Sequence, residues 1–176
     1  MPIKTKPIKT KPIKREESIA KLEESIAKLN EPLLKAAAEN DVEAVKLALA
    51  NGADINAADK DDNTALHLIA KIAKKREPED MKALEFLLGY KGGHESERNL
   101  EHKADVLLLN KEGRSALSIA EEEDESADVQ AKTIRNTLRS SVQNKLKAAI
   151  KEADADLLKR AIEAGAEVDE THTILV

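Results

Sequence analysis

The feature that most constrains this chain of 176 residues is a helical unit that recurs along it. The first copy has Leu-Leu-x-Ala-Ala at residues 33–37, Val-Glu-Ala-Val-Lys-Leu at 42–47 and Asn-Gly-Ala-Asp-Ile-Asn at 51–56. A second copy opens at Thr64, so that Ala65 takes the place that Pro32 has in the first. One such unit cannot bury its own apolar face, whereas stacked units share a continuous core.

These segments resemble the ankyrin-repeat family, whose period of about 33 residues matches the step from Pro32 to Ala65. Thr64-Ala-Leu-His-Leu-Ile-Ala70 is similar to the family's Thr-Pro-Leu-His-x-Ala signature, with alanine in place of proline. A third unit opens with Gly113-Arg-Ser-Ala-Leu-Ser-Ile-Ala120, and a fourth at 145–169 echoes the first with one inserted residue. The resemblance implies an all-α ankyrin-repeat helical solenoid of about four units, some degenerate, over residues 30–170.

Several residues have local roles that fit this fold. Pro32 suits the first turn of a helix, where its missing N–H is not needed. Gly52 and Gly165 follow helix ends, where a left-handed residue is favoured. Thr64 should cap the helix that opens at Ala65.

The resemblance adds a polar role for the signature residues. In the family, the threonine and histidine of the signature bond to each other, and this role carries over to Thr64 and His67. In the third unit Ser115 can replace the threonine, but Ser118 stands where the histidine would be. Gly113 keeps the family's finger-turn glycine.

Composition excludes several classes of site. There is no cysteine, which excludes disulfides, thiolate zinc sites and a cysteine nucleophile. Residues 1–15 carry six Lys and Arg and no acid, which leaves a charge of −11 for the rest of a chain whose net charge is −5. An acidic body argues against nucleic-acid binding by the folded part. No apolar run is long enough to span a membrane.

Two shorter repeats precede the first unit. Pro-Ile-Lys-Thr-Lys recurs with period five, so we expect residues 1–15 to form a disordered basic arm, either for an anionic partner or simply as a solvated tail. Glu-Glu-Ser-Ile-Ala-Lys-Leu occurs twice within residues 16–29, which predicts a helix with an apolar stripe. That stripe, made of Ile19, Leu22, Ile26 and Leu29, either pairs two chains or folds back over the first repeat, and we favour the second.

The second unit runs from Ala65 to Ala116, which makes it longer than the family's period by roughly 18 residues. We place the extra residues at 75–80 and 89–103. The longer insertion holds Tyr90, the one tyrosine of the chain. It is either a contact loop or a tolerated surface insertion.

Little in the chain suggests catalysis. His94, Glu95, Glu97 and His102 could in principle bind zinc, but a loop gives poor preorganisation and no further ligand is evident, so we expect no metal. The acidic run at 121–125 is a solvated segment rather than a catalytic pair. We find no phosphate loop or nucleophile motif, and we expect no catalytic residue and no cofactor.

The resemblance therefore implies a non-enzymatic protein–protein interaction module, an adaptor or scaffold, in the cytoplasm or delivered into a host cell as a microbial effector. The alternative is a structural protein that self-associates through the heptad helix. We expect a protein partner, no membrane span and, more readily than an oligomer, a monomer. Residues 171–176 form a tail, whose Thr173 and Val176 resemble a ligand of carboxylate-capturing PDZ domains. The chain could also be a module of a larger protein. Candidate partner contacts are Asp59, Lys60, Asp61, Tyr90, Lys111, Glu112 and Arg114.

Overall fold

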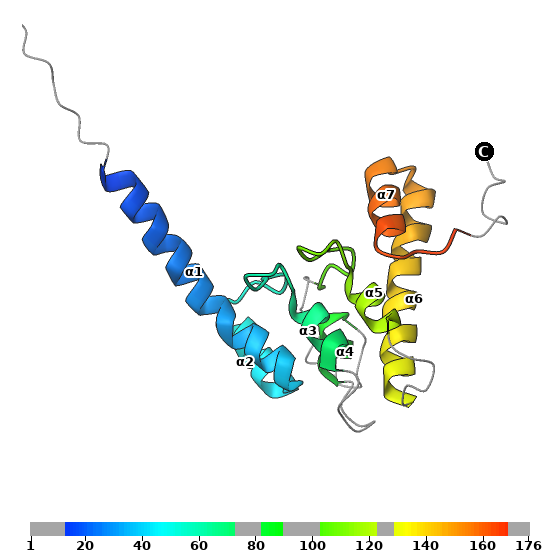
Figure 1. Ribbon diagram of the computed structural model, residues 1–176, viewed down its shortest axis with the longest axis horizontal. Helices are drawn as coiled ribbons and strands as arrows, with labels where there is room; N and C mark the ends of the chain where they lie inside the picture. The colour runs from blue at the N-terminus through cyan, green and yellow to red at the C-terminus, as the bar shows by residue number, and fades with distance from the viewer. Residues whose placement is uncertain (1–12, 73–81, 90–102, 123–128, 169–176) are drawn as a thin grey trace, which may run out of the picture.

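A computed structural model describes residues 13–72, 82–89, 103–122 and 129–168. Within them the chain forms seven α-helices and no strand, which confirms the predicted all-α class. Figure 1 shows α1 (Ile13–Glu39) and α2 (Val42–Ala50) at one end of a row. The opposite end holds α6 (Val129–Glu152) and α7 (Ala155–Glu163). Between them lie α3 (Ala65–Ile72), α4 (Lys82–Leu87) and α5 (Ala116–Glu121).

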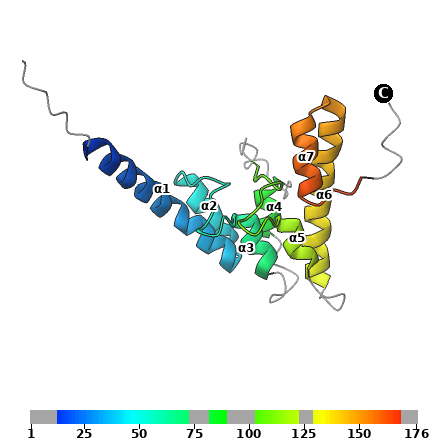
Figure 2. The same ribbon diagram turned by 45° about the horizontal axis from the view of Figure 1, so that its top comes forward.

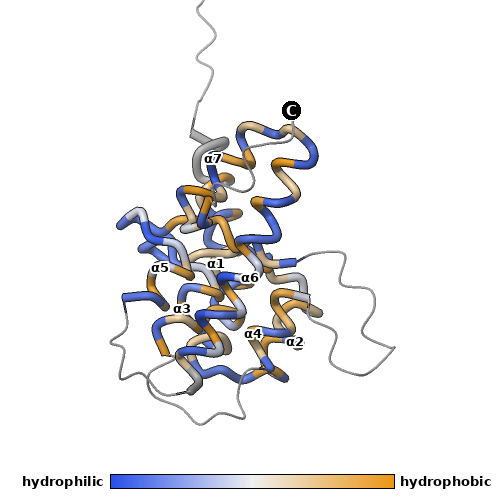
Figure 3. Tube along the Cα trace, turned by 90° about the vertical axis from the view of Figure 1, so that its right-hand side faces the viewer, coloured by the Kyte–Doolittle hydropathy of each residue, from blue (hydrophilic) through white to orange (hydrophobic). Residues whose placement is uncertain are grey.

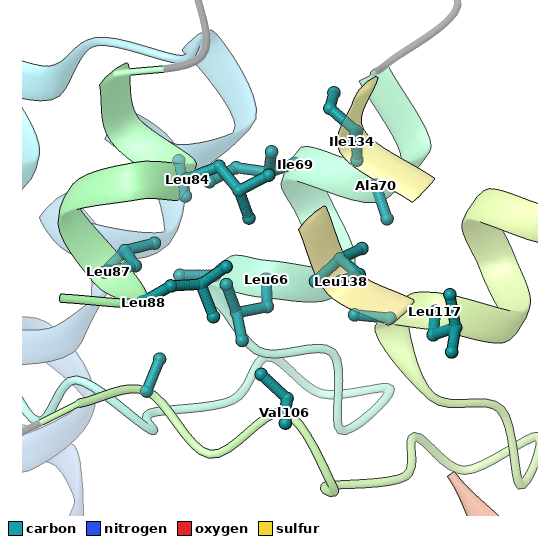
Figure 4. Close-up of a cluster of buried hydrophobic side chains, with 14 of the residues drawn as sticks. Leu66, Ile69, Ala70, Leu84, Leu87, Leu88, Val106, Leu117, Ile134 and Leu138 are labelled. Carbon is teal, nitrogen blue, oxygen red and sulfur yellow. The ribbon is translucent and has the colours of Figure 1, made fainter. Parts of the chain in front are cut away.

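The core runs along this row and is shared by neighbouring helices. α1 packs on α2 and α3, α3 on α5, and α5 on α6. In the middle of the row, four different helices contribute to one buried cluster, which includes Leu66, Leu84, Leu117 and Leu138 (Figure 4). Hydrophobic and hydrophilic residues alternate along the helices, as expected for helices buried on one side (Figure 3). A core shared between neighbours is the property of a solenoid.

We divide the row into four units. Unit 1 is the end of α1, α2 and the loop 53–64, called finger 1, and unit 2 is α3, α4 and the loop 104–115, called finger 2. Unit 3 is α5 with the first half of α6, and unit 4 is the second half of α6 with α7. Units 3 and 4 share one continuous helix, so no finger separates them.

The first and last units have the same backbone. A residue with positive φ ends the long helix in each, Asn40 at 55° and Ala153 at 53°. An aspartate then caps the second helix: Asp41 accepts a hydrogen bond from the Ala44 N–H at 3.0 Å, and Asp154 accepts one from the Leu157 N–H at 2.9 Å.

The sequence separation between these units is constant from end to end. Leu33 and Leu146 are both buried, and Gly52 and Gly165, whose φ values are 94° and 99°, are separated by the same number of positions. The inserted residue expected within the fourth unit is therefore absent over this stretch. That expectation was wrong because it aligned the Lys-Ala-Ala letters of the two helices instead of their buried positions.

Two predictions about the N-terminal segments, the boundary at residue 15 and the place of Pro32 in a first turn, are also wrong. α1 begins at Ile13, within the segment 1–15 predicted to be disordered, and runs without a break past residue 29 to Glu39. Residues 1–12 lie outside the described residues. Pro32 lies inside α1 rather than in its first turn, and its ring leaves the Lys28 carbonyl without its usual donor. Glu31 and Pro32 are exposed, so water can bond that carbonyl.

The N-terminal helix does not fold back over the first repeat. It continues straight out of unit 1 and stands away from the other helices in two views (Figures 1 and 2). Ile19, Leu22, Ile26 and Leu29 are 42–61% exposed. The favoured prediction failed because the helix of the first repeat simply extends upstream, and no turn sequence separates the two segments.

Both predicted insertions fall mainly outside the described residues, as do 171–176, but the ends of the longer one are visible. Gly89 has a φ of 69°, and a side chain there would meet Lys103. The Ala104 N–H donates to the Leu87 carbonyl at 2.9 Å. The segment between them thus leaves and re-enters the fold at one point.

Candidate protein-interaction surface

Finger 1 is built around the carboxylate of Asp59. That side chain accepts hydrogen bonds from the Asp61 N–H at 2.8 Å and from the Asn63 N–H at 2.9 Å. Partial burial by itself would raise the pKa of Asp59, but the hydrogen bonds from Asn63 and Asp61 and the charge of Lys71 lower it overall. Asp62 turns the chain with a φ of 59°, and Ala58 and Thr64 close the finger with a β-bridge.

Finger 2 has the same arrangement, with the side-chain amide of Asn110 in place of the carboxylate of Asp59. The Asn110 side-chain oxygen accepts hydrogen bonds from the N–H groups of Glu112 and Arg114, both at 3.0 Å. Gly113 makes the turn with a φ of 72°. Asn110 occupies the position of Asp59, so both fingers have a side chain that holds the tip from within.

The two fingers are bonded to each other. The buried Asn110 amide donates to the Asn63 side-chain oxygen at 3.0 Å, and Lys71 donates to the same oxygen at 3.0 Å. Nearer the tips, the Lys111 N–H donates to the Asp61 carbonyl at 3.0 Å, and the Lys111 ammonium bonds the Lys60 carbonyl. The tips are therefore fixed relative to one another.

His67 connects unit 2 to finger 2. Its Nδ1 accepts from the Thr64 N–H at 3.1 Å and lies 2.9 Å from the Thr64 hydroxyl, while its Nε2 lies 3.1 Å from the Arg114 carbonyl. These partners fit a neutral ring with the proton on Nε2. Burial lowers the pKa of His67, against the opposing hydrogen bond to Arg114.

The third unit makes the corresponding link without a histidine. The Ser115 hydroxyl is buried and donates to the Ala164 carbonyl at 2.9 Å, and it accepts from the Ser118 N–H at 3.0 Å. One serine thus caps α5 and bonds the next unit, so the missing histidine leaves no gap in the stack.

The predicted contact residues have unequal exposure. Lys60, Asp61, Lys111 and Glu112 are exposed at the two tips, and we call these four residues the finger-tip patch. Asp59 is half-buried and held within finger 1. Tyr90 lies outside the described residues.

Arg114 is also half-buried. It pairs with Glu122 at 2.6 Å and with Glu112. Asp59 and Arg114 therefore shape the fingers, while the finger-tip patch presents two cations and two anions to solvent.

Sequence reasoning missed the buried pair Asn63 and Asn110. The signal was weak, because each is one polar residue in a turn and asparagine is common in turns. Their burial becomes visible once the fingers lie side by side. Because a buried amide needs a partner, this pair contributes to the register between the two fingers.

Other kinds of site find no support in the described part of the chain. No group of three or more His, Asp or Glu residues there could hold a metal ion. His94, Glu95, Glu97 and His102 lie outside it. No described helix is long and apolar enough to cross a membrane.

Comparison with known proteins agrees with this architecture. Residues 33–88, which hold the end of α1, α2, finger 1, α3 and α4, match a family model described as ankyrin repeats (many copies). A search of curated proteins found no match. Ankyrin repeats generally mediate protein–protein interaction, and the family is typically non-enzymatic. Residues 33–88 of this chain are therefore ankyrin repeats.

Proposed function

We propose that this protein is a non-enzymatic adaptor that binds a protein partner through the finger-tip patch. The observation that carries the proposal is the backbone hydrogen bond from Lys111 to Asp61, which holds four exposed charged side chains on two connected loops. Because the loops are already ordered, binding does not have to order them, and less affinity is lost to entropy.

The charges of the patch indicate the partner surface that would fit. Lys60 and Lys111 lie among Asp61 and Glu112, so the patch has no dominant sign. Charged residues at an interface contribute most to specificity and to the rate of association. We therefore propose a partner surface with both acidic and basic side chains, met in the cytoplasm. Use of the protein as a microbial effector would keep the same surface and change the compartment.

The test is affinity capture with the full chain and two charge-swapped variants. Lys60→Glu with Glu112→Lys alters the finger-tip patch, whereas Lys82→Glu with Glu85→Lys alters two exposed residues of α4. Both pairs leave the net charge unchanged. We expect a partner that binds wild type and the α4 variant saturably, and the finger-tip variant at least tenfold more weakly. Circular dichroism should show all three folded.

Equal binding of a saturable partner by all three proteins would place the contact surface elsewhere. Turnover of a substrate by the purified chain, with no saturable protein partner, would remove the adaptor proposal altogether.

A further inference from the structure

An exposed apolar surface lies on one side of α1, before the first repeat. Ile19, Leu22, Ile26 and Leu29 are 50, 61, 49 and 42% exposed, and we call them the apolar stripe. At 1.5 Å per residue the stripe is about 15 Å long. The same heptad spacing continues to Leu33 and Ala36, which are buried in the core. The stripe is thus the upstream continuation of the core side of α1.

The other long helix, α6, has an upstream half that is covered. In α6, the half that precedes Leu146 buries Ala131, Ile134, Leu138 and Val142, and α5 packs against it. Within the described part of the chain, no helix lies in the corresponding place along α1. A helix of about four turns is marginal in water without packing, so the exposed half of α1 lacks its main source of stability.

We propose that a second copy of this chain covers the apolar stripe, and that the two α1 helices form a two-helix pair. The stripe contains only isoleucine and leucine, alternating at the two seam positions of consecutive heptads, which is the composition of a helix–helix seam. The pairing is independent of the finger-tip patch, so each test can fail without the other.

The position of the repeats sets the direction of the pair. The stripe and the buried residues Leu33 and Ala36 lie on the same side of α1. In a parallel pair, the two repeat arrays would therefore have to occupy the same space. An antiparallel pair places the arrays at opposite ends of the two helices, which project freely from each molecule (Figures 1 and 2). Ile19 then faces Leu29 of the second copy, and Leu22 faces its Ile26.

Antiparallel pairing also brings like charges together. Glu23 is exposed at the edge of the stripe, and next to the two-fold axis it lies beside Glu23 of the second copy. In a parallel pair the neighbouring edge position would instead be Ser18. With two heptads and this repulsion, the pair should be weak and reversible.

The first experiment is sedimentation velocity of the full chain from about 1 to about 300 µM, a range that brackets micromolar association. The weight-average mass should rise from 19.2 kDa toward twice that value. Leu22→Glu with Ile26→Glu should weaken association at least tenfold without changing the far-UV circular dichroism of the repeats. Ile162→Glu, at a 46% exposed apolar residue of α7, is the matched control and should associate like wild type.

The second experiment tests direction. Glu23→Lys chains are mixed with isotopically labelled wild-type chains, and the species are counted by native mass spectrometry. An antiparallel pair should give more than the statistical half of mixed dimers, because the introduced lysine on one chain then meets Glu23 on the other. A statistical mixture would overturn the antiparallel arrangement. A wild-type chain that stays monomeric at every concentration, or a dimer that survives Leu22→Glu with Ile26→Glu, would overturn the pairing itself.

Discussion

The first and last helix pairs of this molecule have the same backbone and different surroundings. α1 with α2 and α6 with α7 share a positive-φ residue, an aspartate cap and a terminal glycine, all at one constant sequence separation. In each pair a side chain of the long helix also bonds the segment after the second helix, Asn30 to the Asp54 N–H and Gln143 to the Glu167 carbonyl, both at 2.9 Å. The difference lies in what covers the upstream half of the long helix.

The same helix pair can therefore have its long helix covered by a neighbouring helix, as in α6, or exposed over its upstream half, as in α1. The upstream half of α6 lies along α5, and Arg135 and Arg139 bond the Ala120 carbonyl and the Glu121 carboxylate. The upstream half of α1 shows an apolar stripe instead. Coverage, rather than backbone conformation, should therefore decide how each half contributes to stability.

The largest expected effect separates the two upstream halves directly. Leu138→Ala removes a fully buried side chain beneath α5 and should lower the free energy of unfolding by about 2–5 kcal/mol. Leu22→Ala, in the exposed half of α1, should change it by less than about 0.5 kcal/mol in dilute, monomeric protein. Urea denaturation measures both, and a comparable loss from Leu22→Ala would show that the α1 stripe is already covered.

A second effect compares the two glycines. Gly52→Ala and Gly165→Ala each force a side chain into a left-handed conformation, which costs about 1–2 kcal/mol. The added carbon at 165 would lie 3.4 Å from Leu117 of α5, whereas at 52 it would lie 3.9 Å from Leu29. We expect the greater loss at 165, measured by urea denaturation. Equal losses would mean that the Leu117 side chain moves aside without a cost in free energy.

A third effect tests the equivalence of the caps. Asp41→Ala and Asp154→Ala each remove a carboxylate that accepts a backbone N–H at a helix start. Each should cost about 1 kcal/mol in thermal or urea unfolding, and Asp→Asn at the same sites should retain most of that stability. If one of the two alanine variants left the free energy of unfolding unchanged, the two helix pairs would share a backbone conformation without sharing its energetics.

A fourth effect is the pH dependence of the folding free energy that comes from His67, which lies between the two ends of the row. The folded pKa of His67 lies below its ordinary value of 6.5, so the neutral form stabilises the fold, and this contribution is present above pH 6.5. It should shrink as the pH falls below 6.5, because the unfolded chain takes up the proton first. The stability difference between wild type and His67→Gln should therefore be larger at pH 7.5 than at pH 5.5. A difference that grows on acidification would contradict the neutral assignment.

The smallest effect concerns the turn between the helices of each pair. Ala153→Gly should stabilise the fold by about 0.5 kcal/mol, since alanine is strained at a φ of 53°. Asn40→Gly should bring less, because asparagine tolerates this conformation better. Differential scanning calorimetry of the two variants would compare them, and a larger gain at 40 would reverse the argument.

Local sequence predicted part of this molecule well. The repeat spacing and the Thr-Ala-Leu-His segment were enough for the family, and the structure forms the predicted hydrogen bond between Thr64 and His67. The candidate surface was predicted less evenly. The order of charges could not show that Asp59 and Arg114 are half-buried, because their burial depends on residues of the same finger and of the neighbouring helix.

The sequence by itself determined the helical repeats, the Thr64–His67 pair and the apolar heptads, because each depends on residues a few positions apart. Only the tertiary structure decided that α1 and α6 run unbroken through predicted boundaries and that the fingers are joined through Asn63 and Asn110. It also decided that no other described part of the chain covers the α1 stripe. These features depend on which segments lie side by side. The spacing of apolar residues says which side of a helix must be buried, and only the packed chain says whether a neighbour is there to cover it.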